Sequence, residues 1–499
     1  MKAMEQKVRH CPGCKRNSCT GCGIFQKLNT NKNIPVNLPE FFVPEKQSGF
    51  GVSFDLGTTT LAGMLWDLEQ ALCLGAEAVA NPQAKWGADV ISRLQYAMQG
   101  EKELLLLQKA VVQALDQLAL SMARESFGQT VSFERAVVVG NTAMCQLLMA
   151  VRPEGLSRAP FRPDYGEIRH FKGESLGFVA LAETEVIMLP PIGGYVGADA
   201  LAVYSCIHPE ADEGEKKLLA VDIGTNGEIL LLNGREHYAC SAAAGPALEG
   251  GGAACGMRAA RGAIDRVSLC GSFPMQDLVC HVIGEGEPAG ICGSGLLDAL
   301  AALIGAKIVD ETGYLRSAKE AERKGASKKL ANRISEAEDK EGKVKDNEGR
   351  VNGNEGRTEE KSMGRRIRLT PGEPSVYLYA QDIRHLQLAI GAIRAGIEVL
   401  LAKAGLKAEE LDGIYLAGTF GSYIRVESCM DVGLLPKVNT DKVIQAGNLA
   451  GVGAAMALLS PRFMKAAEKK ADKLIHIELA GDKRFEELFL QYMNFRSRE

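Results

Sequence analysis

Phe54-Asp55-Leu56-Gly57-Thr58-Thr59-Thr60 and Val221-Asp222-Ile223-Gly224-Thr225-Asn226-Gly227-Glu228 are two stretches of the chain with the same pattern. Each follows an apolar segment and precedes another, so each Asp-x-Gly-Thr turn is predicted to be the tip of a β-hairpin. A single Asp-x-Gly turn also occurs in ordinary hairpins. Two copies in matching contexts, a domain's length apart, favour a shared function for the two turns.

The residue types in both turns suit a phosphate ligand. Glycine lets the backbone come close to a phosphate and adopt turn angles that other residues avoid. Threonine and asparagine side chains, together with backbone N–H groups, can donate hydrogen bonds to phosphate oxygens. An aspartate can hold Mg²⁺, usually through water, or orient a nucleophile. The two turns are therefore predicted to be phosphate loops.

Three further elements fit a nucleotide site. Residues 414–422 (Ile-Tyr-Leu-Ala-Gly-Thr-Phe-Gly-Ser) are predicted to form a strand that runs into a Gly-x-x-Gly turn, where small residues let an adenine or ribose lie flat on the backbone. Residues 140–144 (Gly-Asn-Thr-Ala-Met) and 291–296 (Ile-Cys-Gly-Ser-Gly-Leu) each lead into a helix, whose N-terminus attracts phosphate. For these two elements, hinge packing and ligand contact both stay open.

Taken together, these elements resemble the superfamily of acetate and sugar kinases, heat-shock 70 proteins and actin ATPases. Further motifs narrow the resemblance to the reductive activators of corrinoid proteins, over about residues 50–495 apart from a charged insertion. These motifs are 81–83 (Asn-Pro-Gln), 87–93 (Gly-Ala-Asp-Val-Ile-Ser-Arg), 189–199 (Leu-Pro-Pro-Ile-Gly-Gly-Tyr-Val-Gly-Ala-Asp), 243–250 (Ala-Ala-Gly-Pro-Ala-Leu-Glu-Gly), 256–259 (Gly-Met-Arg-Ala) and 381–384 (Gln-Asp-Ile-Arg).

The resemblance implies an α/β fold with two ribonuclease-H-like (actin-like ATPase) lobes and a cleft between them, to which the cysteine spacing described below adds a short N-terminal Cys-rich, metal-binding head. It implies an enzyme that binds ATP and Mg²⁺ in the cleft. Its ATPase activity would drive the uphill one-electron reduction of an inactive Co(II) corrinoid protein or corrinoid-dependent methyltransferase to Co(I). A homodimer is compatible with this assignment.

The motif matches also imply roles for individual residues. The carboxylates of Asp55 and Asp222 would flank the Mg-phosphate site from opposite lobes. Glu228 is a second candidate for positioning the attacking water, and the alternative is that it is an ordinary hairpin glutamate that faces outward. The expected catalytic residues are Asp55, Asp222 and Glu228. The expected nucleotide ligands are Gly57, Thr58, Thr59, Gly224, Thr225 and Asn226 for the phosphates, and Gly418, Thr419 and Gly421 on the nucleoside side.

The first residues carry a separate metal signal. Cys11, Cys14, Cys19 and Cys22 are spaced x2, x4, x2, and thiolates so close together in a reducing compartment indicate metal ligands. The gap is too short for a zinc ribbon, whose knuckles lie about 15–20 residues apart. A [4Fe–4S] cluster is the first choice and a compact zinc site the alternative. The other nine cysteines are scattered and read as core residues.

The short head departs from the resemblance, because corrinoid activators carry a full ferredoxin domain in front or cluster motifs behind. The head would therefore accept electrons from a separate ferredoxin, or the substrate is not a corrinoid. Two alternative functions stay open. One is an activator ATPase of another low-potential iron–sulfur enzyme, and the other is a sugar or carboxylate kinase.

Composition and charge limit the classes of protein that this chain can belong to. A net charge of −4 argues against a nucleic-acid binder. The first residues do not have the pattern of a secretory signal, and we expect no apolar run long enough to span a membrane. A cytoplasmic protein is therefore expected. The expected organisation is a head at 1–24, a linker at 25–48, a first lobe at 49–205, a second lobe at 206–480 with a charged, disordered insertion at 317–366, and a C-terminal helix or tail at 481–499.

Overall fold

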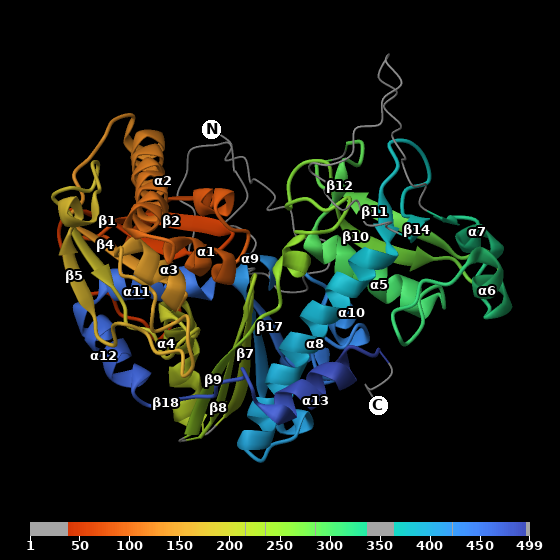
Figure 1. Ribbon diagram of the computed structural model, residues 1–499. Coiled ribbons are helices and arrows are strands. Elements are labelled where there is room, and N and C mark those ends of the chain that lie inside the picture. Colours follow the sequence, from red (N-terminus) through yellow and green to blue (C-terminus); the bar gives the residue numbers. More distant parts are fainter. Residues whose placement is uncertain are drawn as a thin grey trace, which may run out of the picture.

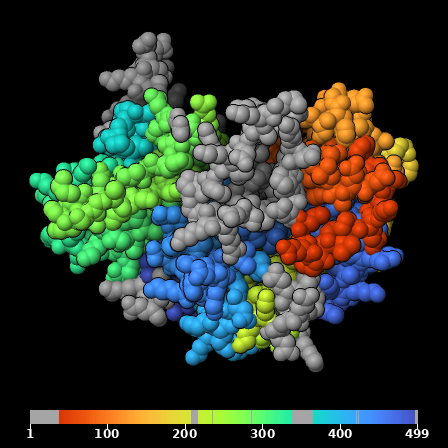
Figure 2. All heavy atoms as spheres, turned by 180° about the vertical axis from the view of Figure 1, so that it is seen from behind, coloured from red at the N-terminus to blue at the C-terminus, as the bar shows by residue number. Residues whose placement is uncertain are grey.

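The computed structural model describes residues 38–214, 216–234, 236–284, 286–336, 364–421 and 423–495, without the side chains at 208–214, 419 and 420. Two α/β lobes lie side by side, and the second lobe carries an additional subdomain at the end away from the first (Figure 1). Seen from behind, the first lobe and this subdomain again lie at opposite ends of the molecule (Figure 2). The expected head at 1–24 lies outside the described residues.

The first lobe is built on a six-stranded sheet of order β3-β2-β1-β4-β6-β5. Its strands are β1 (Phe50–Leu56), β2 (Thr60–Asp67), β3 (Leu72–Ala80), β4 (Arg135–Gly140), β5 (Arg169–Lys172) and β6 (Glu185–Met188). β1 and β2 pair antiparallel as the predicted hairpin, and β1, β4 and β6 run parallel. Val137 and Val138 of β4 belong to different core clusters, so this strand is buried on both faces, as is usual for parallel strands.

The second lobe repeats this plan. Its six-stranded sheet has the order β17-β16-β7-β8-β9-β18. The strands are β7 (Lys217–Ile223), β8 (Gly227–Asn233), β9 (Glu236–Ala242), β16 (Gly413–Ala417), β17 (Val443–Gly447) and β18 (Leu474–His476). β7 and β8 form the second predicted hairpin, and β16 pairs parallel to β7 as β4 does to β1. The predicted pair of α/β lobes is thus confirmed.

The lobes share the core between them. α4 (Ala198–Gly214) leaves the first lobe and α11 (Leu449–Leu459) follows the second-lobe strand β17, and both belong to one hydrophobic cluster that also contains side chains of both sheets. They cross closely, because a Cβ at Gly453 would lie 2.5 Å from the Ala202 carbonyl oxygen. The expected boundary after residue 205 therefore falls inside α4, a helix common to both lobes.

Helices cover the outer faces of the sheets. In the first lobe these are α1 (Val90–Ala97), α2 (Glu101–Phe127) and α3 (Thr142–Leu148). In the second lobe, α8 (Ala380–Lys403) packs against α13 (Lys483–Tyr492), and α12 (Pro461–Ala471) follows α11. Among the described residues, α2 and α8 have the length and apolar composition of a membrane span. Their apolar faces are buried in the cores of the two lobes, so they are core helices.

The described end of the linker, residues 38–48, forms no helix or strand, yet it is attached to the protein. The backbone N–H of Glu45 donates to the Leu459 carbonyl at 2.9 Å, and the Glu45 carboxylate accepts from the Ser460 hydroxyl at 3.0 Å. The linker therefore reaches the first lobe along the junction of α11 and α12.

The additional subdomain contains part of the segment that we expected to be disordered. Its elements are β10 (Ala263–Cys270), β11 (Asp277–Val282), β12 (Gly290–Ile291), α5 (Gly293–Gly305), α6 (Ala318–Arg323), α7 (Lys328–Ala331), β13 (Ile334–Glu336), β14 (Arg365–Arg368) and β15 (Tyr377–Tyr379). The prediction of disorder is wrong for 317–336 and 364–366, because Ala321, Leu330 and Ala331 are buried between the charged residues. Residues 337–363 lie outside the described part of the chain.

Candidate functional site

The two predicted phosphate loops meet at one pocket. It holds about 110 Å³ and lies where the tips of the β1–β2 and β7–β8 hairpins face each other. Its lining residues come from both lobes and from the junction helices: Asp55, Gly57, Thr58, Thr59, Thr60, Asn141, Asp199, Asp222, Ile223, Gly224, Thr225, Asn226, Glu228, Glu249, Gly418, Asn448 and Ala450. The structure therefore brings together Asp55 and Asp222, which we expected to flank one site from opposite lobes.

The tip of the first hairpin is fixed by side chains of its own lobe. The turn is tight, since a Cβ at Gly57 would lie 2.6 Å from the Thr60 carbonyl oxygen. Asn81 donates to the Gly57 carbonyl at 2.9 Å, and Asn141 donates to the Thr58 hydroxyl at 2.9 Å. These contacts hold the Gly57–Thr60 backbone in a single turn conformation.

The tip of the second hairpin is approached by the glycine-rich turn after β16. Gly418 has φ +85°, and a Cβ there would lie 2.6 Å from Asp222 Oδ1, so only glycine permits this contact. Gly418 lines the pocket. Gly421 instead packs against its own strand, where a Cβ would lie 3.2 Å from the Leu416 carbonyl oxygen. The Thr419 side chain lies outside the described part, so its expected role stays a prediction.

The two connecting elements differ. Asn141, which caps α3 after β4, lines the pocket, so ligand contact is the better interpretation for 140–144. In 291–296, the Ser294 hydroxyl donates to the Asp265 carbonyl at 2.9 Å, and Gly295 lies against the Ile264 backbone. This second element packs β10 against α5.

The pocket concentrates carboxylates with little contact to solvent, of which Glu228 is buried and Asp55, Asp199, Asp222 and Glu249 are half-buried. Burial raises the pKa of Asp55 to about 6, although a hydrogen bond from Asn448 opposes the rise, and burial raises the pKa of Asp199 to about 7. The pKa of Asp222 is raised well above its ordinary value by burial and by repulsion from Asp55 and Asp199. Burial also raises the pKa of Glu249. So many acidic groups in one place favour a bound cation, which would stabilise their charged forms.

Glu228 belongs to the same group. Its side chain is buried, lines the pocket and accepts a hydrogen bond from Ser241 at 3.3 Å, while burial and repulsion from Asp199 raise its pKa well above the ordinary value. The alternative of an outward-facing hairpin glutamate is therefore wrong. Within the described ranges, no three His, Cys, Asp or Glu side chains are placed to hold a metal ion directly.

Sequence reasoning did not assign Asp199, Glu249 or Asn448 to the site. Asp199 and Glu249 belong to the motifs 189–199 and 243–250, which served only to recognise the family resemblance and were given no role in the site. Asn448 donates to Asp55 at 2.9 Å and caps α11. A signal for it exists, because a Gly-Asn pair follows a parallel strand and starts a helix twice, at Gly140-Asn141 and at Gly447-Asn448.

Six of the nine described cysteines are buried as predicted, whereas Cys280 is half-buried and Cys270 is exposed, so the prediction of a core residue is wrong for Cys270. Cys145, Cys292 and Cys429 are buried, and burial raises the pKa of the Cys145 thiol to about 12, which keeps it unreactive. Cys255 is half-buried. Cys11, Cys14, Cys19 and Cys22 lie outside the described residues.

Two duplicated α/β lobes with paired phosphate-type turns over an acidic pocket define the class of actin-like ATPase folds. In agreement, residues 216–348 and 335–499 match the family model described as the C-terminal domain of RACo, the ASKHA domain, and residues 50–208 match the RACo middle region. The chain therefore belongs to the RACo family, which confirms the resemblance to reductive activators of corrinoid proteins.

Individual proteins that are similar to this chain have names that agree with this family. A Eubacterium limosum protein named corrinoid activation enzyme RamQ is 31% identical over 461 residues, which cover 91% of this chain and 72% of that protein. A Methanosarcina barkeri protein named [Co(II) methylated amine-specific corrinoid protein] reductase is 25% identical over 481 residues, covering 89% and 77%. A solved structure named reductive activator for corrinoid,iron-sulfur protein superposes with a TM-score of 0.76 at 30% identity, covering 90% of this chain and 66% of that one.

Proposed function

We propose that this chain is an ATP-dependent reductive activator that reduces the Co(II) state of a corrinoid protein or corrinoid-dependent methyltransferase to Co(I). The observation that carries the proposal is the meeting of two phosphate-type turns from two lobes over one buried acidic pocket. The names of the relatives supply the substrate class. The chain spans about two thirds to three quarters of their lengths, so the activity of the whole relatives is transferred here as a proposal.

The pocket residues fit a nucleotide with Mg²⁺. Asp55 and Asp222, which both line the pocket, would hold the hydrated cation, whose charge would neutralise the phosphate oxygens. The hydroxyls and amides of Thr58, Thr225 and Asn226 are placed to donate to those oxygens. Glu228 orients the attacking water as a hydrogen-bond acceptor. Gly418, which lines the pocket beside Asp222, would contact the nucleoside.

Nucleotide entry would require the lobes to separate. Drug-sized ligands occupy pockets of about 300–1,000 Å³, whereas the space between the tips is about 110 Å³. The tips touch across the cleft, with 2.6 Å between the hydroxyl oxygens of Thr59 and Thr225. Because α4 and α11 join the lobes, the lobes would rotate about these two helices. Nucleotide binding would then bias the equilibrium between closed and open forms. That change of shape is how ATP would act on a docked partner.

The electron would come through the N-terminal residues. The spacing of Cys11, Cys14, Cys19 and Cys22 supports an iron–sulfur cluster, with zinc as the alternative, and a separate ferredoxin as the electron donor. Such a cluster supplies one electron at a time. A cytoplasmic location follows from this reducing chemistry, and a homodimer is a further part of the proposal.

The test is an anaerobic assay of the full chain with a Co(II) corrinoid protein, Mg-ATP and a low-potential donor, read from the visible spectrum of the cobalt. We expect Co(I) to accumulate only when ATP and the chain are both present. ATP consumption should rise when the corrinoid protein is added. Reduction at the same extent without ATP would contradict the proposal, and phosphorylation of a sugar or carboxylate instead would favour a kinase.

A further inference from the structure

The second lobe forms hydrogen bonds to the tip of the first lobe at Thr59. The Thr59 hydroxyl lies 2.6 Å from the Thr225 hydroxyl and donates to Glu249 Oε2 at 2.9 Å. The Arg258 guanidinium donates to the Thr59 backbone carbonyl at 3.0 Å. Side chain and backbone of a single residue in the first lobe thus contact three residues of the second lobe.

The same carboxylate oxygen also receives the hydroxyl of the second tip. Thr225 donates to Glu249 Oε2 at 2.7 Å. One anionic oxygen therefore accepts hydrogen bonds from both phosphate loops at once, which is what a phosphate oxygen between the two tips would do. A phosphate and the Glu249 carboxylate cannot use these two hydroxyls together, because two anions would then lie at contact distance without water between them.

The hydrogen count makes the strength of the contact depend on the charge of Glu249, since a protonated carboxyl group would supply a third hydrogen. Three oxygens, from Thr59, Thr225 and Glu249, lie 2.6–2.9 Å apart. The two hydroxyls supply only two hydrogens, so with an ionised carboxylate one of the three oxygen pairs has no hydrogen between its atoms. That pair is repulsive, and replacing the carboxylate with a ligand that separates the two hydroxyls would relieve it.

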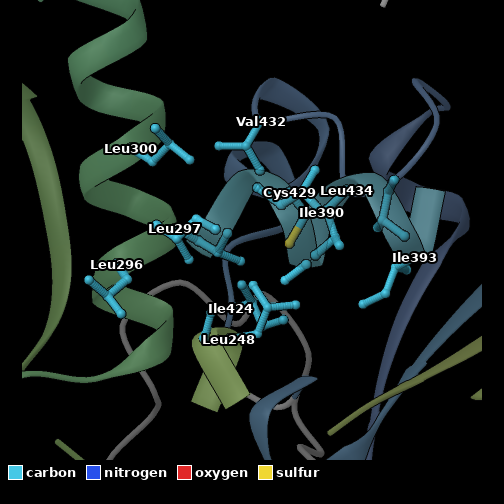
Figure 3. Close-up of a cluster of buried hydrophobic side chains, with 14 of the residues drawn as sticks. Leu248, Leu296, Leu297, Leu300, Ile390, Ile393, Ile424, Cys429, Val432 and Leu434 are labelled. Atoms are coloured by element: carbon cyan, nitrogen blue, oxygen red, sulfur yellow. The ribbon is translucent and has the colours of Figure 1, made fainter. Parts of the chain in front are cut away.

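Glu249 is attached firmly to the second lobe. It ends a short helical turn, Pro246–Glu249, whose Leu248 is fully buried. Figure 3 shows Leu248 among the side chains of α5, α8 and the helix Val426–Asp431, with Leu296, Ile390 and Cys429 nearby. Gly250 follows with φ +82° against the Met257 carbonyl, which fixes the direction of the chain. Parting of the lobes therefore pulls Thr59 away from Glu249.

We propose that Glu249 is an anionic latch, assisted by Arg258, which holds the two tips together and competes with the terminal phosphate of Mg-ATP for Thr59 and Thr225. The latch sets the affinity and the entry rate of the nucleotide. This inference rests on the proposed function, since it requires the nucleotide to bind between the tips. Diphosphates, which lack the terminal phosphate, compete with the latch less.

The test compares the full-length parent with Glu249→Gln, which keeps the shape of the side chain and removes its charge. Titration calorimetry should show Mg-ATP binding about tenfold more tightly to the variant, the size of one charge-assisted hydrogen bond. Stopped-flow mixing with a fluorescent ATP analogue should show faster association, and Mg-ADP affinity should change less. Asp116→Asn is the control, because that carboxylate is buried and accepts two backbone N–H groups away from the pocket.

Arg258→Met is the second variant, at an exposed position where folding is not at risk. It removes the contact to the Thr59 carbonyl and should also speed association. Unchanged association rates in both variants would overturn the latch, and weaker Mg-ATP binding to Glu249→Gln would show that Glu249 is a nucleotide ligand instead. If the parent binds no Mg-ATP, the proposed function fails. Hydrogen exchange at residues 57–60, expected to be faster in Glu249→Gln, would still report on the latch.

Discussion

The two hairpin tips come from the same plan, but they are supported differently. The tip at Gly57–Thr60 is held from behind by Asn81 and Asn141, which bind its carbonyl and its hydroxyl. At the second tip, a Cβ on Gly224 would meet only the Asn226 carbonyl, at an ordinary 3.6 Å. The first turn is therefore held by two amides of its lobe, whereas the second turn is held by the Glu249 carboxylate, which accepts from Thr225, and has more space around its glycine.

The aspartates differ in the same way. Asn448 donates to Asp55 and limits the rise of its pKa to about 6, so Asp55 is largely ionised near neutral pH. The influences on Asp222, namely burial and the neighbouring carboxylates Asp55, Asp199 and Glu249, all raise its pKa. The first tip is thus prepared for a ligand, whereas the second tip depends on an arriving cation to become charged.

The largest effect is expected at Asp222. Replacing it with asparagine removes the carboxylate that the cation would charge, so ATP turnover should fall by about a hundredfold or more, in the range seen when one electrostatic contact to a transition state is lost. The folded state should be at least as stable as the parent, because a buried repulsive group is gone. Steady-state ATPase assays and thermal melting measure both. Full turnover in Asp222→Asn would contradict the assigned role.

A pH series tests the difference between the aspartates. The pKa of Asp55 is raised from 3.8 to about 6 in the folded chain, so its contribution to the free energy of unfolding is present below about pH 4 and is lost as pH rises through about 6. Urea unfolding at pH 4 and pH 8 should show that Asp55→Asn gains about 2.5 kcal/mol relative to the parent over this interval. Groups away from the pocket cancel in the comparison, whereas Asp199 and Asp222, whose pKa values the Asp55 charge raises, add to the gain of the variant. A pH-independent difference would show that the pKa of Asp55 is not perturbed.

Alanine at each tip glycine compares the two turns directly. Gly57→Ala places a methyl group 2.6 Å from a backbone oxygen and should cost about 2 kcal/mol of unfolding free energy, whereas Gly224→Ala should cost about 0.5 kcal/mol or less. Urea unfolding curves measure both values. Equal costs would mean that the turns are equally constrained.

The smallest effect is expected from the support behind the first tip. Asn141→Ala removes the hydrogen bond to the Thr58 hydroxyl and should weaken Mg-ATP binding by about fivefold, the size of one ordinary hydrogen bond of about 1 kcal/mol. Titration calorimetry measures the change. Gln108→Ala is the matched control, since that amide donates to the Leu148 carbonyl at the other end of α3. A similar loss in the control would assign the effect to α3 rather than to the tip.

Local patterns predicted much of this structure. The apolar segments around the two turns predicted both hairpins. The apolar residues Ile383, Leu386 and Ile390 follow one another at three and four residues, which is the spacing of the helix that the structure has at Ala380–Lys403. The charged stretch misled because its few buried apolar residues, Ala321, Leu330 and Ala331 among them, are outnumbered by the charged residues around them. The composition of the stretch therefore predicted a solvated, disordered segment, whereas a few buried apolar side chains attach α6 and α7 to the subdomain.

Contacts between distant segments were harder to predict. α11 is buried on every side from Ala450 to Leu459, so it has no apolar stripe to show that it lies between both sheets. Glu249 meets Thr59 across the cleft from a segment far away in the sequence, and no local pattern encodes that pairing. Site residues inside the hairpin tips could be predicted, whereas those brought in by the packing of the lobes could not.

Both tips are proposed to bind the same Mg-triphosphate, and calorimetric titration of the full chain with Mg-ATP tests this directly. We predict one nucleotide per chain, dependent on Mg²⁺, with protons released as the carboxylates of the pocket become charged, and with fewer protons released in Asp222→Asn. An absence of Mg²⁺-dependent binding, or binding that is the same in Asp222→Asn as in the parent, would show that the two tips do not share a nucleotide.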